Sequence, residues 1–396
     1  MTPKPLRLGV IGLGRAFTIM LPTFLHDPRV RLAGATDPIA AARRQFEADL
    51  GAPAYDSIEA LCAAPDVQAV YVATPHQLHA EHVCLAASFG KHIWVEKPMA
   101  TTLDECTRMI DAVRAAGVHL IIGPSHSFNR PVQRVREMIA SGAYGRVRMI
   151  TAQQFTDFLY RPRRPEELDT KAGGGVVHSQ AAHQMDIIRL LGGGLVRSVR
   201  AHTGAWDPAR PTEGAYGALL GFADNTFCCA SYSGYAHYDS DVLLDNIAES
   251  GRPKNPDDYG AARRQLAKAG SEAQEAALKA ARNYGGSLYQ TATTIPADMA
   301  YRHFGHIIVS CERGDLRPTA RGVEVYADTR RFFEALPPPA IPRAEIIDEF
   351  YDAIMRDKPP VHDGAWARAT TETCLGILES ARTQTEFVPR HQVAPA

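Results

Sequence analysis

The chain has 396 residues, of which 45% are hydrophobic and 22% are charged, and its formal net charge at pH 7 is −1. This length predicts two or three compact domains, and the composition excludes a disordered chain, a collagen and a small disulfide-rich protein. Without an excess of basic residues we expect no nucleic-acid partner, and no apolar run reaches the roughly 18 residues that a membrane span needs. The seven cysteines are scattered without a Cys-x-x-Cys pair, which indicates reduced thiols in a cytoplasmic protein.

The first half of the chain alternates short apolar runs with stretches of helical spacing. This alternation is typical of an α/β fold with a doubly wound parallel sheet, so residues 1–124 are predicted to form an NAD-binding Rossmann domain. The predicted strands span 6–11, 30–36, 68–73, 92–95 and 119–122, and the predicted helices span 15–26, 38–50, 77–90 and 102–117.

Runs of neighbouring strands replace this alternation after residue 125. They predict a separate α+β domain over 125–396 with an open, mainly antiparallel sheet. Its predicted strands span 145–154, 195–204, 215–223, 226–234, 306–312 and 321–327, and its predicted helices span 130–141, 176–191, 343–357 and 365–383. Residues 239–300 do not fit this sheet and are predicted to be an insertion, helical over 259–283, that acts as a lid, an oligomer arm or a mobile loop.

A glycine turn follows the first predicted strand. Gly12 permits the tight turn, Gly14 lets the backbone approach a pyrophosphate, and the first helix begins with Arg15 and Ala16, which we assign to the same cofactor site. Asp37 ends the second strand, where a carboxylate accepts the ribose hydroxyls and repels a 2′-phosphate, so NAD is the predicted cofactor. The third position of the fingerprint is usually small but is Phe17 here, whose ring is expected to shift the helix or lie against the cofactor.

Polar residues also follow the next strands, at the sheet edge where ligands of open parallel sheets bind. Thr74, Pro75 and His79 follow the strand at 68–73, and Glu96 and Lys97 follow the strand at 92–95. Desolvation lowers the pKa of a lysine toward general acid/base use, but a simple ion pair with Glu96 stays open on residue type alone.

The series His76, His79 and His82 has a spacing that zinc ligands can use. His76 is expected in a loop, and no acidic or cysteine partner stands beside the series, so no metal site is predicted.

Four motifs occur in order: the glycine turn, Thr74-Pro75, Glu96-Lys97-Pro98, and the triplet at 173–175 followed by His183-x-x-Asp186. Together they resemble the glucose–fructose oxidoreductase/inositol dehydrogenase (Gfo/Idh/MocA) family over nearly the whole chain except the insertion. The resemblance implies a Rossmann domain, a second domain with an open sheet, and a homo-oligomer, either a dimer or a tetramer.

The resemblance also implies the catalytic residues. Lys97 corresponds to the family's catalytic lysine beside the nicotinamide, and His183 to the histidine that contacts the substrate and assists proton transfer. The family commonly has an aspartate where this chain has Ser179, and an asparagine where it has His76. The missing aspartate weakens the carry-over of a sugar-type hydroxyl clamp onto Ser179.

Arginines cluster before the glycine triplet, at Arg161, Arg163 and Arg164, and Arg302 with His303 form a second candidate near the end of the insertion. Guanidinium groups in a loop leading to His183 favour substrate carboxylates, although ion pairs with Glu166 and Glu167 are an equal alternative. The arginine loop, the helical insertion and residues 305–315 together resemble the phthalate 4,5-cis-dihydrodiol dehydrogenases within the family.

The substrate implied is a carboxylated cis-dihydrodiol, oxidised to a catechol with NAD as hydride acceptor. A sugar, inositol or other polyol dehydrogenase is the alternative enzyme, and a non-catalytic NAD-binding sensor or scaffold is the second alternative. Retention of Lys97 and His183 favours an enzyme over the sensor.

Overall fold

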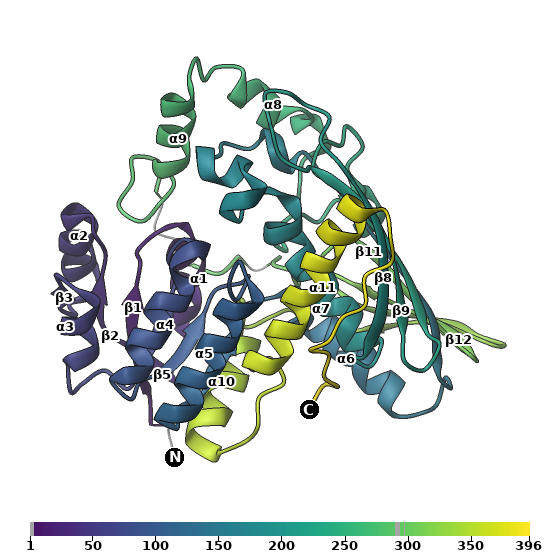
Figure 1. The fold of residues 1–396 in the computed structure, drawn as a ribbon, viewed down its shortest axis with the longest axis horizontal. Helices are drawn as coiled ribbons and strands as arrows, with labels where there is room; N and C mark the ends of the chain where they lie inside the picture. The colour runs from purple at the N-terminus through teal and green to yellow at the C-terminus, as the bar shows by residue number, and fades with distance from the viewer. Residues whose placement is uncertain (1–3, 290–293, 297) are drawn as a thin grey trace.

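The structure, a computed structural model, describes residues 4–289, 294–296 and 298–396, and it contains two β-sheets that lie side by side with helices around them (Figure 1). The first sheet comes from the N-terminal third of the chain, and the second comes from its middle and later parts. No helix among these described residues is long and apolar enough to cross a membrane.

The first sheet is parallel throughout, as the alternating pattern predicts. Its strands are β1 (Leu6–Ile11), β2 (Val30–Thr36), β3 (Ala54–Tyr55), β4 (Ala69–Val72), β5 (His92–Val95) and β6 (Leu120–Ile122), and its helices are α1 (Arg15–His26), α2 (Ala40–Leu50), α3 (Ile58–Ala63), α4 (His79–Ser88) and α5 (Leu103–Ala116). In the strand order β3-β2-β1-β4-β5-β6, the topological switch point lies between β1 and β4. Dinucleotides bind at this point in such sheets. The sequence does not predict β3 and α3, because elements this short show no clear periodicity.

Local signals explain where these helices start and stop. Thr102 and Glu105 form a reciprocal capping box at the start of α5, and Gly117 ends that helix with a φ of +64°. All four residues of β4 are buried, the pattern of a strand covered on both faces.

The second sheet has eight strands and is antiparallel except where β7 pairs with β10. Its strands are β7 (Val147–Phe155), β8 (Val196–Gly204), β9 (Ala215–Phe222), β10 (Phe227–Ser233), β11 (His306–Cys311), β12 (Gly314–Thr319), β13 (Gly322–Ala327) and β14 (Arg331–Ala335). The order is β14-β13-β12-β11-β7-β10-β9-β8, which confirms the predicted open, mainly antiparallel sheet. The sequence does not predict β12, whose Pro318 is a poor strand former but lies where β12 pairs with β13 alone.

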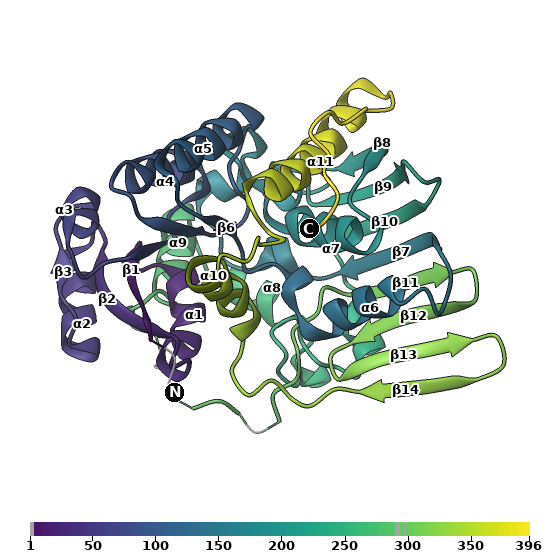
Figure 2. The ribbon, with the colours of Figure 1, turned by 90° about the horizontal axis from the view of Figure 1, so that it is seen from below.

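One face of the second sheet carries helices, and the last helix of the chain contacts elements of both sheets (Figure 2). The helices are α6 (Arg130–Ala140), α7 (Ala182–Leu191), α10 (Ala344–Arg356) and α11 (Gly364–Thr383). Although α10 comes late in the chain, it packs on the first sheet, with Phe350 6.2 Å from Trp94 between ring centroids. The ring of Trp366 in α11 lies 3.9 Å from the buried guanidinium of Arg189 in α7.

The insertion contains two short helices, α8 (Ala261–Leu266) and α9 (Glu272–Ala280), rather than one helix over 259–283. Gly270 interrupts the helical composition, and Ser271 caps α9 by accepting a hydrogen bond from the backbone of Gln274. The insertion arches from the second sheet over to the first (Figure 1).

The end of the insertion docks on Phe17, the residue that departs from the glycine fingerprint. The Phe17 ring is completely buried, with Phe24 and Phe46 at centroid distances of 6.4 and 6.0 Å. Tyr284 meets it edge-on at 5.1 Å, and its hydroxyl donates to Asp49 Oδ2 over 2.7 Å. The large residue is therefore part of the core on which the insertion rests.

Candidate active site

The turn between β1 and α1 has the shape that a dinucleotide requires. Gly12 has a φ of +98°, and a Cβ atom there would lie 2.9 Å from the carbonyl oxygen of Ala73. A Cβ atom on Gly14 would meet nothing within 4 Å, which leaves room for a pyrophosphate at the N-terminus of α1. Arg15 is exposed and Ala16 half-buried in the first turn of that helix. The residues present therefore fit NAD.

Asp37 follows the C-terminal end of β2 and turns its carboxylate toward this turn. Its Oδ2 accepts a hydrogen bond from the backbone of Leu13 over 2.7 Å, and its Oδ1 accepts one from Ile39 over 2.8 Å. The side chain is half-buried, so lone pairs remain for ribose hydroxyls. Asp37 thus braces the glycine turn besides facing the position expected for the ribose.

His79 connects the two loops that follow β4 and β5. Its Nε2 lies 2.9 Å from the carbonyl oxygen of Thr74, and its Nδ1 lies 3.0 Å from that of Pro98. Burial lowers the pKa of His79 to about 4, so the ring is neutral and one of the two contacts is a hydrogen bond. His82 contacts Thr74 Oγ1 at 3.0 Å, so two of the three histidines in the series, His79 and His82, have protein partners.

Lys97 reaches from the first sheet to the second. Its Nζ donates to the carbonyl oxygen of Ser179 over 3.2 Å. Burial lowers the pKa of Lys97 from its usual 10.5, against the opposing charges of Glu96 and Glu249. Glu96 accepts a hydrogen bond from the Tyr71 hydroxyl over 2.6 Å. The amine is therefore in the poorly solvated environment that the strand end predicts.

Ser179 lies in a π-helical turn, Val177–Ala181, that runs directly into α7. Its hydroxyl donates back to the carbonyl oxygen of Gly175, while its own carbonyl oxygen accepts from Lys97. The contact with Lys97 thus comes from the Ser179 backbone, and the side chain is turned toward its own helix.

His183 lies one helical turn after Ser179 and is only 4% exposed. Its Nδ1 is 3.4 Å from Ser125 Oγ, and its ring meets the ring of His126 edge-on at 4.7 Å. Burial, together with the charge of Lys97, holds the pKa of His183 well below 6.5. The ring is therefore a neutral imidazole that feels the charge of Lys97.

The three arginines of the cluster before the glycine triplet have different surroundings. Arg161 pairs with Asp157 at 3.1 Å, yet 43% of its side chain remains exposed. The guanidinium of Arg163 lies 3.6 Å from the centroid of the Phe158 ring and donates to the Phe158 carbonyl oxygen. Arg164 pairs at 3.0 Å with Glu166, as expected if this arginine forms an ion pair within the protein rather than binding a substrate carboxylate. Arg161 and Arg164 therefore keep similar exposed fractions, 43% and 41% of their side chains, whereas only 11% of the Arg163 side chain is exposed.

Arg302 and His303 differ in how many of their nitrogen atoms have hydrogen-bond partners. Arg302 Nη2 lies 3.2 Å from His126 Nε2, and its Nε and Nη1 are enclosed without a hydrogen-bond partner among the residues that the structure describes. His303 donates through Nε2 to the carbonyl oxygen of Ile247 and accepts the backbone N–H of Gly305 through Nδ1. Arg302 therefore has free donors, whereas both ring nitrogens of His303 have backbone partners.

Two residues of this site are absent from the sequence-based prediction. His126 lies in the turn His126–Phe128 after β6, and Glu249 lies in the insertion. The distance between His126 Nε2 and Glu249 Oε1 is 3.2 Å. The position of His126 just after a parallel strand is a signal that could have identified it. Nothing local to Glu249 distinguishes it from other acidic residues in the insertion.

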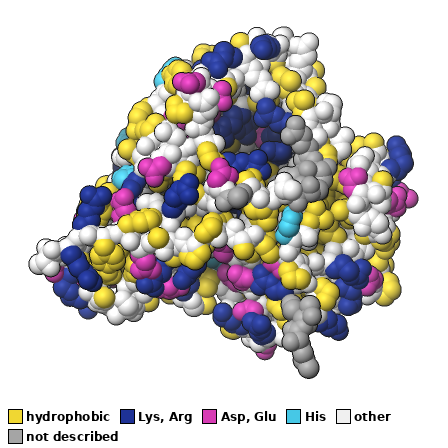
Figure 3. All heavy atoms as spheres, turned by 180° about the vertical axis from the view of Figure 1, so that it is seen from behind, with side chains coloured by type: hydrophobic (Ala, Val, Ile, Leu, Met, Phe, Trp, Pro, Cys, Tyr) yellow, Lys and Arg dark blue, Asp and Glu magenta, His cyan; other side chains and the backbone are white. Residues whose placement is uncertain are grey.

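Basic side chains gather in a hollow of the surface on the face drawn in Figure 3. The electrostatic partners of Lys97 include Arg163, Arg302 and Glu249, and those of Glu249 include Arg161 and Arg302. These side chains, together with His183, form one cluster, which we call the Lys97–Glu249 cluster. A desolvated amine and a neutral imidazole are groups that can move a proton, and the free donors of Arg302 can bind an anion.

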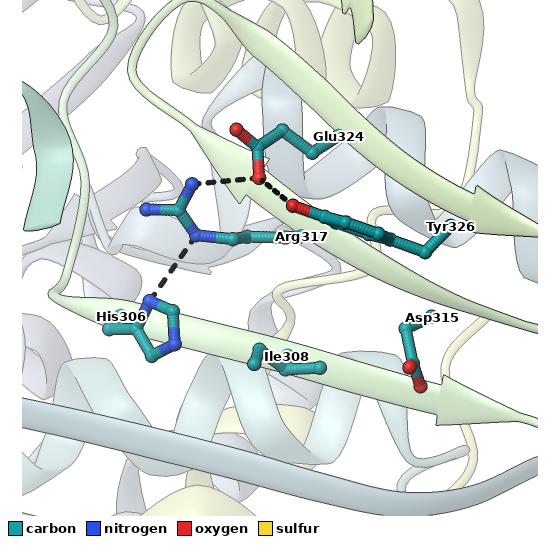
Figure 4. Close-up of a pocket in the computed structure, with 6 residues that line it drawn as sticks. All are labelled: His306, Ile308, Asp315, Arg317, Glu324 and Tyr326. Atoms are coloured by element: carbon teal, nitrogen blue, oxygen red, sulfur yellow. Dashed lines mark hydrogen bonds and ion pairs between the residues drawn. The ribbon is translucent and has the colours of Figure 1, made fainter. Parts of the chain in front are cut away.

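A second hollow, of about 370 Å³, lies on the face of the second sheet opposite its helices. In it Arg317 pairs with Glu324 at 2.9 Å and donates to His306, while the Tyr326 hydroxyl also donates to Glu324 (Figure 4). None of the residues predicted for cofactor or catalysis lines it.

Family models match both parts of the chain. The model described as an oxidoreductase family with an NAD-binding Rossmann fold matches residues 6–124, and that of the GFO/IDH/MocA C-terminal domain matches residues 132–251. The first of these ranges contains the glycine turn and Lys97, and the second contains His183 and Glu249.

Individual proteins are similar over nearly the whole chain. A 1-carboxy-3-chloro-3,4-dihydroxycyclohexa-1,5-diene dehydrogenase from Comamonas testosteroni is 47% identical over 382 residues, which is 96% of each chain. The crystal structure of a protein from Bordetella bronchiseptica RB50 superposes with a TM-score of 0.91 and 39% identity, covering 98% of this chain and 100% of that one. The WlbA dehydrogenase from Bordetella pertussis, in complex with NADH and UDP-GlcNAcA, has the same fold at a TM-score of 0.67 and 21% identity, with coverage of 98% and 99%.

Proposed function

Because this chain belongs to the Gfo/Idh/MocA family and is an NAD-dependent oxidoreductase, we propose that it oxidises a cis-dihydrodiol whose ring carries a carboxylate, with Lys97 and His183 moving the proton. The observation that carries the proposal is the contact of Lys97 Nζ with the turn that leads to His183, beside arginine donors.

The arginines support a carboxylated substrate. Arg302 has enclosed N–H groups without a partner in the described part of the chain, and a substrate carboxylate would satisfy them. Arg161 and Arg163 add positive charge, whereas a neutral sugar or inositol needs none. The relative from Comamonas testosteroni bears the name of a carboxylated, chlorinated cyclohexadiene diol. On sequence resemblance alone, the member of this class would be phthalate 4,5-cis-dihydrodiol, which gives 4,5-dihydroxyphthalate; the charges around Arg302 favour a diol with one carboxylate instead.

The chain's own groups would act in this order. Lys97, with its pKa lowered by burial, or sharing its proton with His183, accepts the proton of one ring hydroxyl. NAD held at the glycine turn would supply the hydride acceptor for the ring carbon that carries this hydroxyl. The resulting hydroxy-dienone then loses a ring proton, regains one on oxygen, and becomes a catechol, so aromatisation draws the reaction toward oxidation.

Replacement of Lys97 tests the proton transfer. Lys97→Met should lower kcat by roughly 10²–10⁴, the usual effect of losing a positioned base, with NAD affinity retained. Lys268→Met, at an exposed lysine of the insertion, is the matched control and should retain wild-type turnover. Wild-type turnover in Lys97→Met that still binds NAD would refute the role.

A substrate panel tests the function itself. NADH absorbance would be followed with cis-dihydrodiols with and without ring carboxylates, and with inositol and sugars. Turnover confined to carboxylated diols supports the proposal. Equal rates on the uncarboxylated diol would remove the arginine role, turnover of polyols alone would favour the alternative enzyme, and NAD binding without any turnover would favour the sensor.

We also propose that the protein self-associates through the outer face of the second sheet. Large hydrophobic residues on β9, β10 and β14 are exposed by 42–50%: Leu219, Phe227 and Phe333. Leu219 and Phe227 lie on the neighbouring strands β9 and β10, Phe333 lies on the opposite edge strand β14, and exposed apolar side chains of this kind are typical of a protein interface. Light scattering should give the mass of a dimer or tetramer, and Phe227→Arg should lower it; a wild-type monomer would contradict this.

A further inference from the structure

Glu249 is held at the tip of a short hairpin rather than on a loose loop. Ile247 and Pro253 form an isolated antiparallel bridge, and the backbone N–H of Ala248 donates to Arg252 over 2.8 Å. Gly251, with a φ of +83°, passes so close to the carbonyl oxygen of Ala300 that a Cβ atom would lie 2.2 Å from it. The hairpin therefore has a defined position.

His303 fastens this hairpin to the second sheet. Its Nε2 donates to the carbonyl oxygen of Ile247 over 2.8 Å, two residues before Glu249. Both ring nitrogens are occupied by backbone partners, so His303 acts as a positioning residue for the hairpin. The neighbouring Arg302 is meanwhile held through its carbonyl oxygen by Asn129 Nδ2 at 2.8 Å.

The carboxylate of Glu249 lies among cations and a histidine. His126 Nε2 is 3.2 Å from its Oε1, and Asn129 Nδ2 donates to His126 Nδ1, which leaves the Nε2 proton for Glu249. Burial alone would raise the pKa of the Glu249 carboxyl, but His126, Arg161 and Arg302 hold it well below its usual range. Glu249 is therefore a permanent anion beside the free donors of Arg302.

Three side chains, His126, His183 and Glu249, place one possible metal-ligand atom each within 4.8 Å of the others. The surrounding charges oppose a cation there. Arg302 Nη2 lies 3.2 Å from His126 Nε2, and the charge of Lys97 disfavours a positive charge on His183. These surroundings suit an anion, and Glu249 already supplies one.

We infer that Glu249 occupies the place that a second ring carboxylate would need, so that this enzyme prefers a cis-dihydrodiol with a single carboxylate, bound by Arg302. The inference rests on the proposed function for its substrate class. A second carboxylate would have to lie beside a fixed anion in an enclosed site, where like charges repel strongly. Glu249 is thus a specificity-determining residue that excludes dicarboxylates such as phthalate 4,5-cis-dihydrodiol.

Turnover by the NAD-loaded enzyme gives the first test. Wild-type kcat/KM should be at least about tenfold higher for benzoate cis-dihydrodiol than for phthalate cis-dihydrodiol. Glu249→Gln, which keeps the shape and removes the charge, should lower this ratio at least about tenfold, through the KM of the dicarboxylate. Glu379→Gln, on the exposed surface of α11, is the matched control and should keep the wild-type ratio. A wild-type preference for the dicarboxylate, or an unchanged ratio in Glu249→Gln, would overturn the inference.

Binding of product analogues separates this inference from the proposed function. Calorimetry of the NADH complex with 3,4-dihydroxybenzoate and 4,5-dihydroxyphthalate needs no turnover. Glu249→Gln should tighten the dicarboxylate at least about tenfold and change the monocarboxylate less than about threefold. Equal changes for both ligands, or none, refute the role of Glu249 even if diols are oxidised. Absence of diol turnover with the expected binding shift would instead refute the proposed reaction and leave the charge preference standing.

Discussion

Removal of the Tyr284 side chain should release the insertion from the first sheet. Tyr284 is 4% exposed, meets Phe17 edge-on at 5.1 Å and donates its hydroxyl to Asp49. In Tyr284→Ala the lost ring burial, the aromatic pair and a hydrogen bond to an exposed carboxylate together cost about 3–4 kcal/mol of docking free energy. That change raises the population of the undocked insertion more than about a hundredfold.

Hydrogen exchange read by mass spectrometry measures this opening. Amides of α9 and of the segment up to Tyr289 should exchange faster in Tyr284→Ala, while amides of β4 and β5 keep their protection. Tyr284→Phe removes only the hydroxyl, which is worth about 1 kcal/mol, and should speed exchange about fivefold.

Tyr259→Ala provides the control, because this tyrosine belongs to the same insertion but is 61% exposed. In Tyr259→Ala the amides of the insertion should exchange at the wild-type rate. If Tyr284→Ala exchanges no faster than Tyr259→Ala, the aromatic contact with Phe17 does not hold the insertion, and the reasoning is refuted.

Three further predictions concern the cofactor and the core. Asp37→Asn keeps an acceptor near Leu13 but removes the charge, so the NADP-to-NAD ratio of kcat/KM should rise about tenfold or more in steady-state kinetics; an unchanged ratio would contradict the role of Asp37. Arg189→Met leaves carbonyl acceptors of Trp366 and Val393 unpaired in the core and should lower the free energy of unfolding by about 3–5 kcal/mol in denaturant, whereas a loss below about 1 kcal/mol would be inconsistent with that role. Burial alone would lower the pKa of His362, but Glu349 and Asp186 raise it above 6.5, so its contribution to stability is complete below about pH 6.5 and is lost as pH rises through the raised pKa. His362→Gln should therefore destabilise the protein more near pH 6 than near pH 9, and equal losses at both would argue against a charged His362.

Most of the first sheet could be derived from the chain because its signals are local, whereas the two-residue strand β3 has no such signal. Burial on both faces makes β4 a continuous apolar run, and the turn at Gly12 must be glycine because its φ is positive. In the second sheet β12 was not predictable in this way, since Pro318 masks a strand that its neighbours stabilise. The candidate pair of Lys97 and His183 came from motif resemblance, and the geometry brings the lysine onto the turn beside the histidine.

The sequence by itself determined the Rossmann architecture, the glycine turn with Asp37 and the position of Lys97 after β5, because strand periodicity and turn chemistry are properties of a few consecutive residues. Only the tertiary structure decided which cations keep free donors and which anion lies beside them. His126 and Glu249 are 123 positions apart, and no local pattern reports a partner that folding brings from another element. The charge that a ligand would meet at this site therefore depends on a hairpin of the insertion, which the chain positions only once both sheets and His303 are in place.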